Sequence, residues 1–103
     1  MTPPAAFPRV AGRLACGPHG LDELAERFGT PLYVYDMGWI EGRYRSLRDA
    51  FRGADLLVAY SVKANGNLAL LNRLAALGSG ADIVSLGELH RALRAGIPPE
   101  RIV

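Results

Sequence analysis

The residue in this sequence best suited to covalent chemistry is Lys63, which lies in the stretch VAYSVKANGN over residues 58–67. An apolar run precedes it, and a run with helical spacing follows it. Burial pushes a lysine amine toward its neutral form, which is the nucleophile that Schiff-base chemistry needs. A lysine at the end of an apolar run also commonly reaches solvent, so position alone leaves a reactive amine and a surface lysine both open.

Two carboxylates are candidates for the same site. Asp82 ends a short apolar run and could hold or orient the ammonium form of Lys63. It could equally bond to nearby backbone, as aspartates at strand ends often do. Glu88 follows Ser85 at the spacing of a helix capping box, and that structural role explains it better than chemistry does.

The elements that would position these residues alternate regularly from Asp55 onward. Short apolar or β-branched runs predict strands, runs with helical spacing predict helices, and Asn67 is a candidate helix cap. The predicted order is strand, helix, strand, helix and strand, over residues 55–62, 67–78, 81–85, 85–96 and 97–103. Such alternation predicts an α/β fold with a parallel sheet, in which functional groups gather at the carboxyl ends of the strands.

The spacing of this alternation is that of the units of a (β/α)8 barrel, of which two units and the start of a third strand are present. A complete barrel needs about 250 residues, so we expect the N-terminal portion of a TIM-like barrel. Residues 55–103 form this portion. Residues 21–54 are predicted to form a helix, a strand-like segment (PLYVYD) and a second helix, and residues 1–20 an irregular arm.

Composition narrows the class of protein. Half of the 103 residues are hydrophobic and 21% are charged, which is typical of a globular chain. The net charge of +2 is small and dispersed, so we expect no nucleic-acid partner. Cys16 is the single cysteine, which predicts neither a disulfide nor a metal cluster and indicates a cytoplasmic setting. No apolar run approaches the roughly 20 residues of a membrane span, and the N-terminus lacks a signal-peptide pattern.

The motif YSVKAN, at residues 60–65, resembles the Y-x-V-K-A-N signature of fold-type III pyridoxal phosphate enzymes. More broadly, FGTPLYVYD, LLVAYSVKAN and LGSGADIVSLGELHRALRAGIPPERIV follow one another as in the N-terminal part of the diaminopimelate decarboxylase family. The resemblance runs from about Leu21 to Val103. Two positions depart from the family pattern: Leu86 stands where glycine is usual, and Gly66 where serine or proline is commoner.

The resemblance implies a PLP-dependent decarboxylase that converts meso-diaminopimelate to L-lysine and carbon dioxide in lysine biosynthesis. It assigns the Schiff base with pyridoxal 5′-phosphate to Lys63, a position beside that lysine to Asp82, and contacts near the cofactor to Asn65 and Glu88. It also implies a small-molecule amino-acid substrate and a homodimeric full-length enzyme. The family's phosphate-binding loop and its other cofactor contacts map beyond Val103, so we expect the isolated chain to be unstable or to aggregate, and to lack appreciable activity.

Two other interpretations stay open. Another fold-type III enzyme would share much of the lysine block, whether a decarboxylase of ornithine, arginine or carboxynorspermidine or an alanine racemase-like enzyme. From a different class, the chain could be a non-catalytic module that retains only the first units of the barrel.

Overall fold

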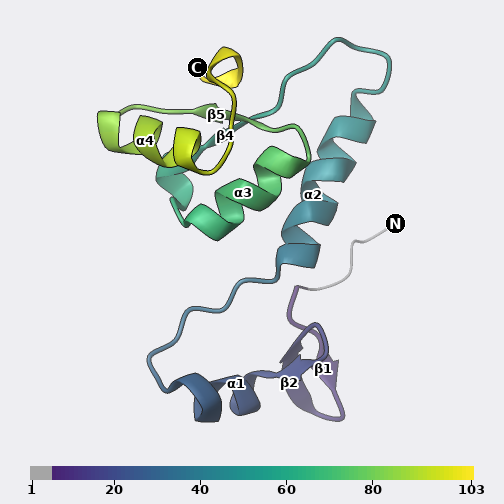
Figure 1. Ribbon diagram of the computed structural model, residues 1–103. Coiled ribbons are helices and arrows are strands. Elements are labelled where there is room, and N and C mark those ends of the chain that lie inside the picture. Colours follow the sequence, from purple (N-terminus) through teal and green to yellow (C-terminus); the bar gives the residue numbers. More distant parts are fainter. Residues whose placement is uncertain (1–5) are drawn as a thin grey trace. The chain divides into compact units, whose positions relative to one another are not determined.

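The computed structural model describes residues 6–103, which divide into two compact units between Ile40 and Glu41. Figure 1 shows the elements of both units, each of which is described here by itself. Within the described residues, no helix combines the length and the apolar character required to cross a lipid bilayer.

The first unit begins with three short antiparallel strands: β1 (Arg9–Val10), β2 (Arg13–Cys16) and β3 (His19–Gly20). The irregular arm expected over residues 1–20 is therefore wrong for the part that the structure describes, and residues 1–5 lie outside the described residues. The turn between β1 and β2 has positive φ at both Ala11 and Gly12. An Asn-Gly or Asp-Gly pair usually marks such a turn, and its absence hides the hairpin from sequence analysis.

Helix α1 (Leu21–Phe28) follows, as predicted, and ends at Gly29, where φ is 82°. An ion pair of 2.8 Å between Arg13 and Asp22 joins β2 to this helix. The next segment, residues 31–36, forms no strand, contrary to expectation. Its aromatic and β-branched residues favour a strand only where a neighbouring strand accepts the backbone hydrogen bonds, and Tyr33 is 87% exposed.

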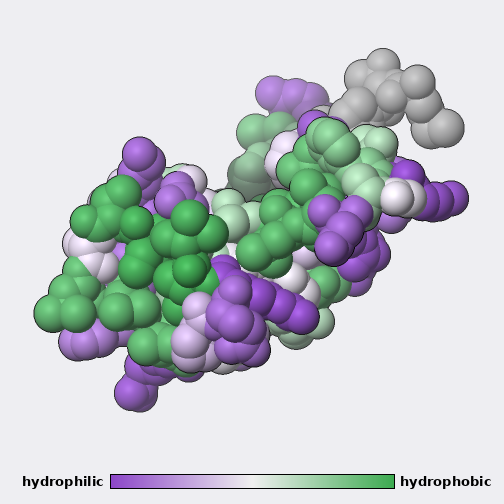
Figure 2. Space-filling view, turned by 90° about the horizontal axis from the view of Figure 1, so that it is seen from above, coloured by the Kyte–Doolittle hydropathy of each residue, from purple (hydrophilic) through white to green (hydrophobic). Residues whose placement is uncertain are grey.

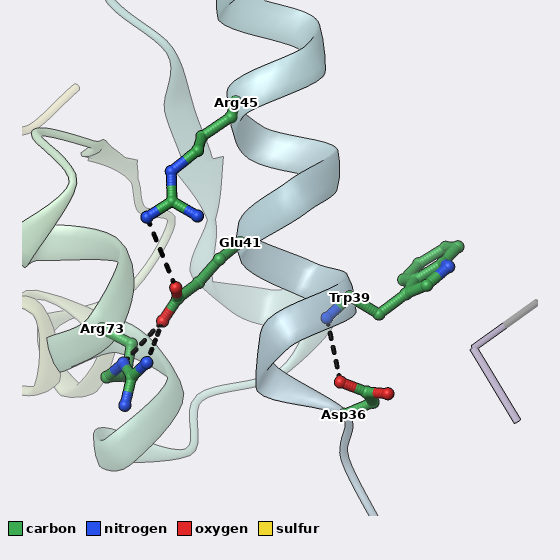
Figure 3. A network of polar contacts seen from close by, with 5 residues as sticks. All are labelled: Asp36, Trp39, Glu41, Arg45 and Arg73. Atoms are coloured by element: carbon green, nitrogen blue, oxygen red, sulfur yellow. Dashed lines mark hydrogen bonds and ion pairs between the residues drawn. The ribbon is translucent and has the colours of Figure 1, made fainter. Parts of the chain in front are cut away.

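Helix α2 (Met37–Ala50) starts where the Asp36 carboxylate accepts a hydrogen bond of 2.9 Å from the backbone N–H of Trp39. The part of α2 in the second unit is fastened to helix α3 (Leu68–Ala76) by Glu41, whose side chain is almost fully buried. The Glu41 carboxylate pairs with Arg73 at 2.5 Å and, more loosely, with Arg45 at 3.6 Å (Figure 3).

The rest of the second unit is the predicted parallel arrangement. Strand β4 (Ala59–Ser61) pairs in parallel with β5 (Gly80–Asp82), and α3 connects them. Helix α4 (Leu86–Arg94) then leads to a 3-10 turn, η2 (Pro99–Arg101), and Ile102 forms a parallel bridge with Ala81. This bridge is the start of the third strand, as predicted.

Packing between the strand pair and its helices makes the core of this unit. Helices α3 and α4 lie side by side along the pair (Figure 1). The buried apolar residues of α3, of β5 and of α4 with the segment that follows it are Leu70, Leu71, Leu74, Ala81, Ala92, Ala95 and Ile97. Several large apolar side chains remain exposed, among them Phe51, Val84 and Leu86, and Figure 2 shows broad hydrophobic areas on the surface.

Candidate functional site

Lys63 lies one residue beyond Val62, at the carboxyl end of β4, in a short 3-10 turn, η1 (Val62–Ala64). It is the only lysine in the sequence, since every other basic side chain apart from the two histidines is arginine. Val62 points into the core at 2% exposure, whereas Lys63 is exposed. Residues 6–103 therefore do not supply the burial that would favour the neutral form of this amine. An exposed amine is free to meet a ligand at this end of the sheet.

Asp82 ends β5 directly opposite Ser61, the last residue of β4. The Ser61 hydroxyl donates a hydrogen bond of 2.8 Å to one oxygen of the Asp82 carboxylate. Neither interaction expected for Asp82 is therefore observed: within residues 6–103 no ion pair involves Lys63, and the hydrogen bond of Asp82 comes from a side chain. Ser61 went unnoticed in the sequence because its link to Asp82 depends on strand register, which no local pattern encodes.

The turn after Lys63 is held by several hydrogen bonds. The Asn65 side-chain oxygen accepts from the backbone N–H of Asn67 at 3.1 Å, and the Tyr60 hydroxyl donates to the Asn65 backbone carbonyl at 3.2 Å. Asn67 then caps α3 by accepting from the N–H groups of Ala69 and Leu70. The predicted cap is confirmed. A cofactor contact from Asn65 stays a prediction, and its side-chain amide nitrogen is the group left to make it.

Glu88 occupies the capping box that its spacing predicts. Ser85 accepts from the backbone N–H of Glu88 at 3.2 Å, while one Glu88 oxygen accepts from the Ser85 hydroxyl at 2.8 Å and from the Val84 N–H at 3.3 Å. The other oxygen, Oε1, is buried and has no hydrogen-bond partner among the described residues. Because an unpaired buried carboxylate oxygen is costly, this atom is suited to accept a hydrogen bond from a bound group.

A second contact reaches the turn from α4. The Arg91 guanidinium donates a hydrogen bond of 3.0 Å to the backbone carbonyl of Gly66. Nothing in the local sequence pattern indicates this contact, which joins residues 25 positions apart.

Together these residues place an exposed amine, a hydroxyl-bound carboxylate and an unpaired carboxylate oxygen on consecutive β/α units. An amine can bond covalently to an aldehyde, and acidic groups can hold the amine's proton or orient a polar ring. This donor set fits pyridoxal 5′-phosphate, an aldehyde cofactor. Within residues 6–103, no three His, Cys, Asp or Glu side chains group closely enough to hold a metal ion.

Comparisons with known proteins agree with this geometry. Residues 37–103 match the family model described as the pyridoxal-binding domain of pyridoxal-dependent decarboxylases. Over 83 residues, 81% of this chain, the sequence is 58% identical to the diaminopimelate decarboxylase of Aquifex aeolicus and 55% identical to that of Pseudomonas aeruginosa. These segments make up 19% and 20% of the two relatives, so the chain spans about a fifth of their length.

A solved structure extends the likeness to three dimensions. The diaminopimelate decarboxylase of M. jannaschii, crystallised with L-lysine, superposes on 93% of this chain with a TM-score of 0.88 and 41% identity. The aligned part is 24% of that protein.

Proposed function

Because the chain belongs to the family of pyridoxal-dependent decarboxylases, whose pyridoxal-binding domain it matches, we propose that it carries the cofactor-binding lysine of an enzyme that converts meso-diaminopimelate to L-lysine and carbon dioxide. The relatives named diaminopimelate decarboxylase support this substrate, as does the L-lysine bound to the M. jannaschii enzyme. The chain would then supply the first units of the TIM-like barrel.

One observation carries the proposal: the only lysine of the sequence lies at the carboxyl end of a parallel strand. This is the edge of an α/β sheet at which ligands bind. The Lys63 amine would hold the cofactor by condensing with its aldehyde carbon, whose oxygen leaves as water. When bound, pyridoxal phosphate supplies an electron sink for the pair of electrons that remains on the α-carbon as carbon dioxide leaves.

The neighbouring groups have distinct roles in this proposal. Asp82, with one oxygen fixed by Ser61, holds or orients the ammonium form of Lys63 with its remaining oxygen. Glu88 Oε1 accepts a hydrogen bond from the bound cofactor, while the other oxygen keeps its capping role. Asn65 binds the cofactor through its side-chain amide nitrogen.

Decarboxylation assays test the substrate. The full-length enzyme that contains this segment, supplied with pyridoxal phosphate, is offered meso-diaminopimelate, L-ornithine, L-arginine or carboxynorspermidine, and released carbon dioxide and amine product are measured. We expect L-lysine from meso-diaminopimelate with the full-length enzyme, none from its Lys63→Ala variant, and no appreciable activity from residues 1–103 alone. Faster carbon dioxide release from another of these amino acids would identify that amino acid as the substrate. Racemisation of alanine without carbon dioxide release would show that the enzyme is a racemase. Cofactor binding without turnover of any substrate would favour a non-catalytic module.

The role of Asp82 has its own test. Ser61→Ala removes the donor that fixes its carboxylate, and we expect cofactor addition to Lys63 to slow about tenfold, the effect of losing one hydrogen bond to a charged group. Ser46→Ala, the same change at an exposed position of α2, is the matched control. Equal rates of cofactor addition in Ser61→Ala and the unchanged protein would show that the orientation of Asp82 does not matter for this step.

The homodimer and the cytoplasmic setting rest on the family resemblance and on the single free cysteine, Cys16. Light scattering of the purified full-length enzyme tests the first. A monomeric mass at micromolar concentration would contradict it. Fractionation of cells tests the second, and recovery of the protein outside the cytoplasmic fraction would contradict it.

A further inference from the structure

The segment that carries Lys63 has little structure of its own. The 3-10 turn η1 contains three residues, and the backbone bond from the Asn65 N–H to the Val62 carbonyl, 3.1 Å, closes it. Such turns have poorer hydrogen-bond geometry than an α-helix. Their orientation therefore depends on what holds the chain on either side. On one side β4 fixes the backbone through its pairing with β5. On the other side lies the turn of residues 65–67.

Two side chains from outside hold that turn. The Tyr60 hydroxyl donates to the Asn65 carbonyl at 3.2 Å, and the Arg91 guanidinium donates to the Gly66 carbonyl at 3.0 Å. Tyr60 belongs to the same strand as the site, whereas Arg91 comes from α4, in the next β/α unit. The Arg91 bond is charge-assisted, and so it is the stronger kind of contact.

Glycine at position 66 fits this contact. A β-carbon there would lie 3.3 Å from Cδ of Arg91, closer than an ordinary packing distance. Six glycines of the described chain have positive φ, but Gly66 is not among them, so its backbone conformation does not require glycine. The absence of a side chain instead leaves room for Arg91.

We propose that Arg91 is a positioning residue for Lys63. By holding the Gly66 carbonyl it fixes the turn after η1 and with it the direction in which the lysine presents its amine. The inference rests on the proposed function, since it assumes that Lys63 binds pyridoxal phosphate. In this inference the orientation of Lys63 depends on α4, through an arginine that does not itself touch the cofactor.

The test compares arginines of one helix. Arg94 is also exposed on α4, and among the described contacts it makes no hydrogen bond or ion pair. Arg91→Ala and Arg94→Ala therefore remove the same charge from the same helix. Pyridoxal phosphate is added to each variant, the rate of adduct formation is followed by absorbance, and borohydride reduction with peptide mapping identifies Lys63. Visible circular dichroism of the adduct reports whether the cofactor is held in a fixed orientation.

We expect Arg91→Ala to slow adduct formation about threefold to tenfold and to weaken the circular dichroism band, since one exposed charge-assisted bond is lost. Arg94→Ala should leave the rate within about twofold and the band unchanged. Arg91→Lys, which keeps a donor and the charge, should recover part of the rate. Urea unfolding curves measured in parallel show that each variant is folded under the assay conditions. A weaker circular dichroism band in a folded variant therefore reports a change in how the cofactor is held, because a loss of stability alone would leave the band intact.

Gly66→Ala provides a second test that keeps the arginine. Its methyl group requires Arg91 to shift by a few tenths of an ångström, so the rate should fall in the unchanged background and stay constant in the Arg91→Ala background. Equal effects of Gly66→Ala in both backgrounds would overturn the inference, as would equal rates for Arg91→Ala and Arg94→Ala. If the unchanged protein forms no adduct at Lys63, the proposed function fails as well, and the inference fails with it.

Discussion

Replacing Gly80 by alanine should detach the third strand from the sheet. Gly80 opens β5 and is buried, and a β-carbon there would collide with the backbone carbonyl oxygen of Arg101 and lie 3.2 Å from Cδ2 of Leu57. A flexible side chain could move aside, but the Arg101 carbonyl belongs to the backbone immediately before the bridge of Ile102. The added methyl group therefore requires the chain after η2 to shift.

The cost follows from two terms. Inserting a methyl group into a packed site typically costs about 1–3 kcal/mol. The shift also loosens the hydrogen bonds that hold the third strand, from the Val103 N–H to the Ala81 carbonyl at 2.8 Å and from the Ile83 N–H to the Val103 carbonyl at 3.0 Å. Each contributes about 1 kcal/mol. With both bonds lost, the free energy of unfolding should fall by about 3–5 kcal/mol.

Urea denaturation of a monodisperse preparation, followed by far-ultraviolet circular dichroism, measures this change. Hydrogen exchange of the Val103 and Ile83 amides shows whether the third strand has detached. Gly42→Ala is the control, because a β-carbon at that exposed helical position meets nothing within 4 Å. It should stabilise the protein by about 0.5–1 kcal/mol. An unchanged urea midpoint for Gly80→Ala, with both amides still protected, would refute the reasoning.

Two further predictions concern single side chains. Arg73→Met leaves the buried Glu41 carboxylate with only its 3.6 Å contact to Arg45, so the free energy of unfolding should fall by about 1–3 kcal/mol. Arg45→Met should cost less than about 1 kcal/mol, because its contact is longer. Equal losses for the two variants in urea denaturation would contradict this prediction. Burial, with a smaller contribution from the Asp36 carboxylate, raises the pKa of the Cys16 thiol, so the folded protein holds this proton to higher pH than the unfolded chain. Its contribution to stability therefore declines as the pH rises from the unfolded thiol pKa through the folded one, and iodoacetamide should modify Cys16 more slowly in the folded protein than in urea. Asp36→Asn, which keeps the helix cap, should speed the reaction, and an unchanged rate would count against the Asp36 contribution.

The fold could be predicted from sequence where local signals were strong. Apolar runs separated by helical spacing located β4, α3, β5 and α4, and Ser85 marked the start of α4 correctly. The failures both lie in the first unit. Strands of two to four residues joined by an Ala-Gly turn leave too little pattern to detect. Residues 31–36 have strand propensity without a partner, and propensity alone does not make a strand.

The site could be predicted only in part for a related reason. Lys63 could be proposed because its motif and its position after an apolar run are both local. The bonds that surround it join residues 21 and 25 positions apart, Ser61 with Asp82 and Arg91 with Gly66. Strand register and the rotation of α4 determine these pairs, and both are set by packing of the whole unit.

Borohydride trapping tests the central claim most directly, because Lys63 is the only lysine of the sequence. The protein is incubated with pyridoxal phosphate, reduced, digested and mapped by mass spectrometry, with Lys63→Arg as the control that keeps the charge. The account predicts one reduced pyridoxyl group on the peptide that contains Lys63 and none there in the variant. A protein that takes up no label at saturating cofactor, or that is labelled equally well in Lys63→Arg, would contradict it.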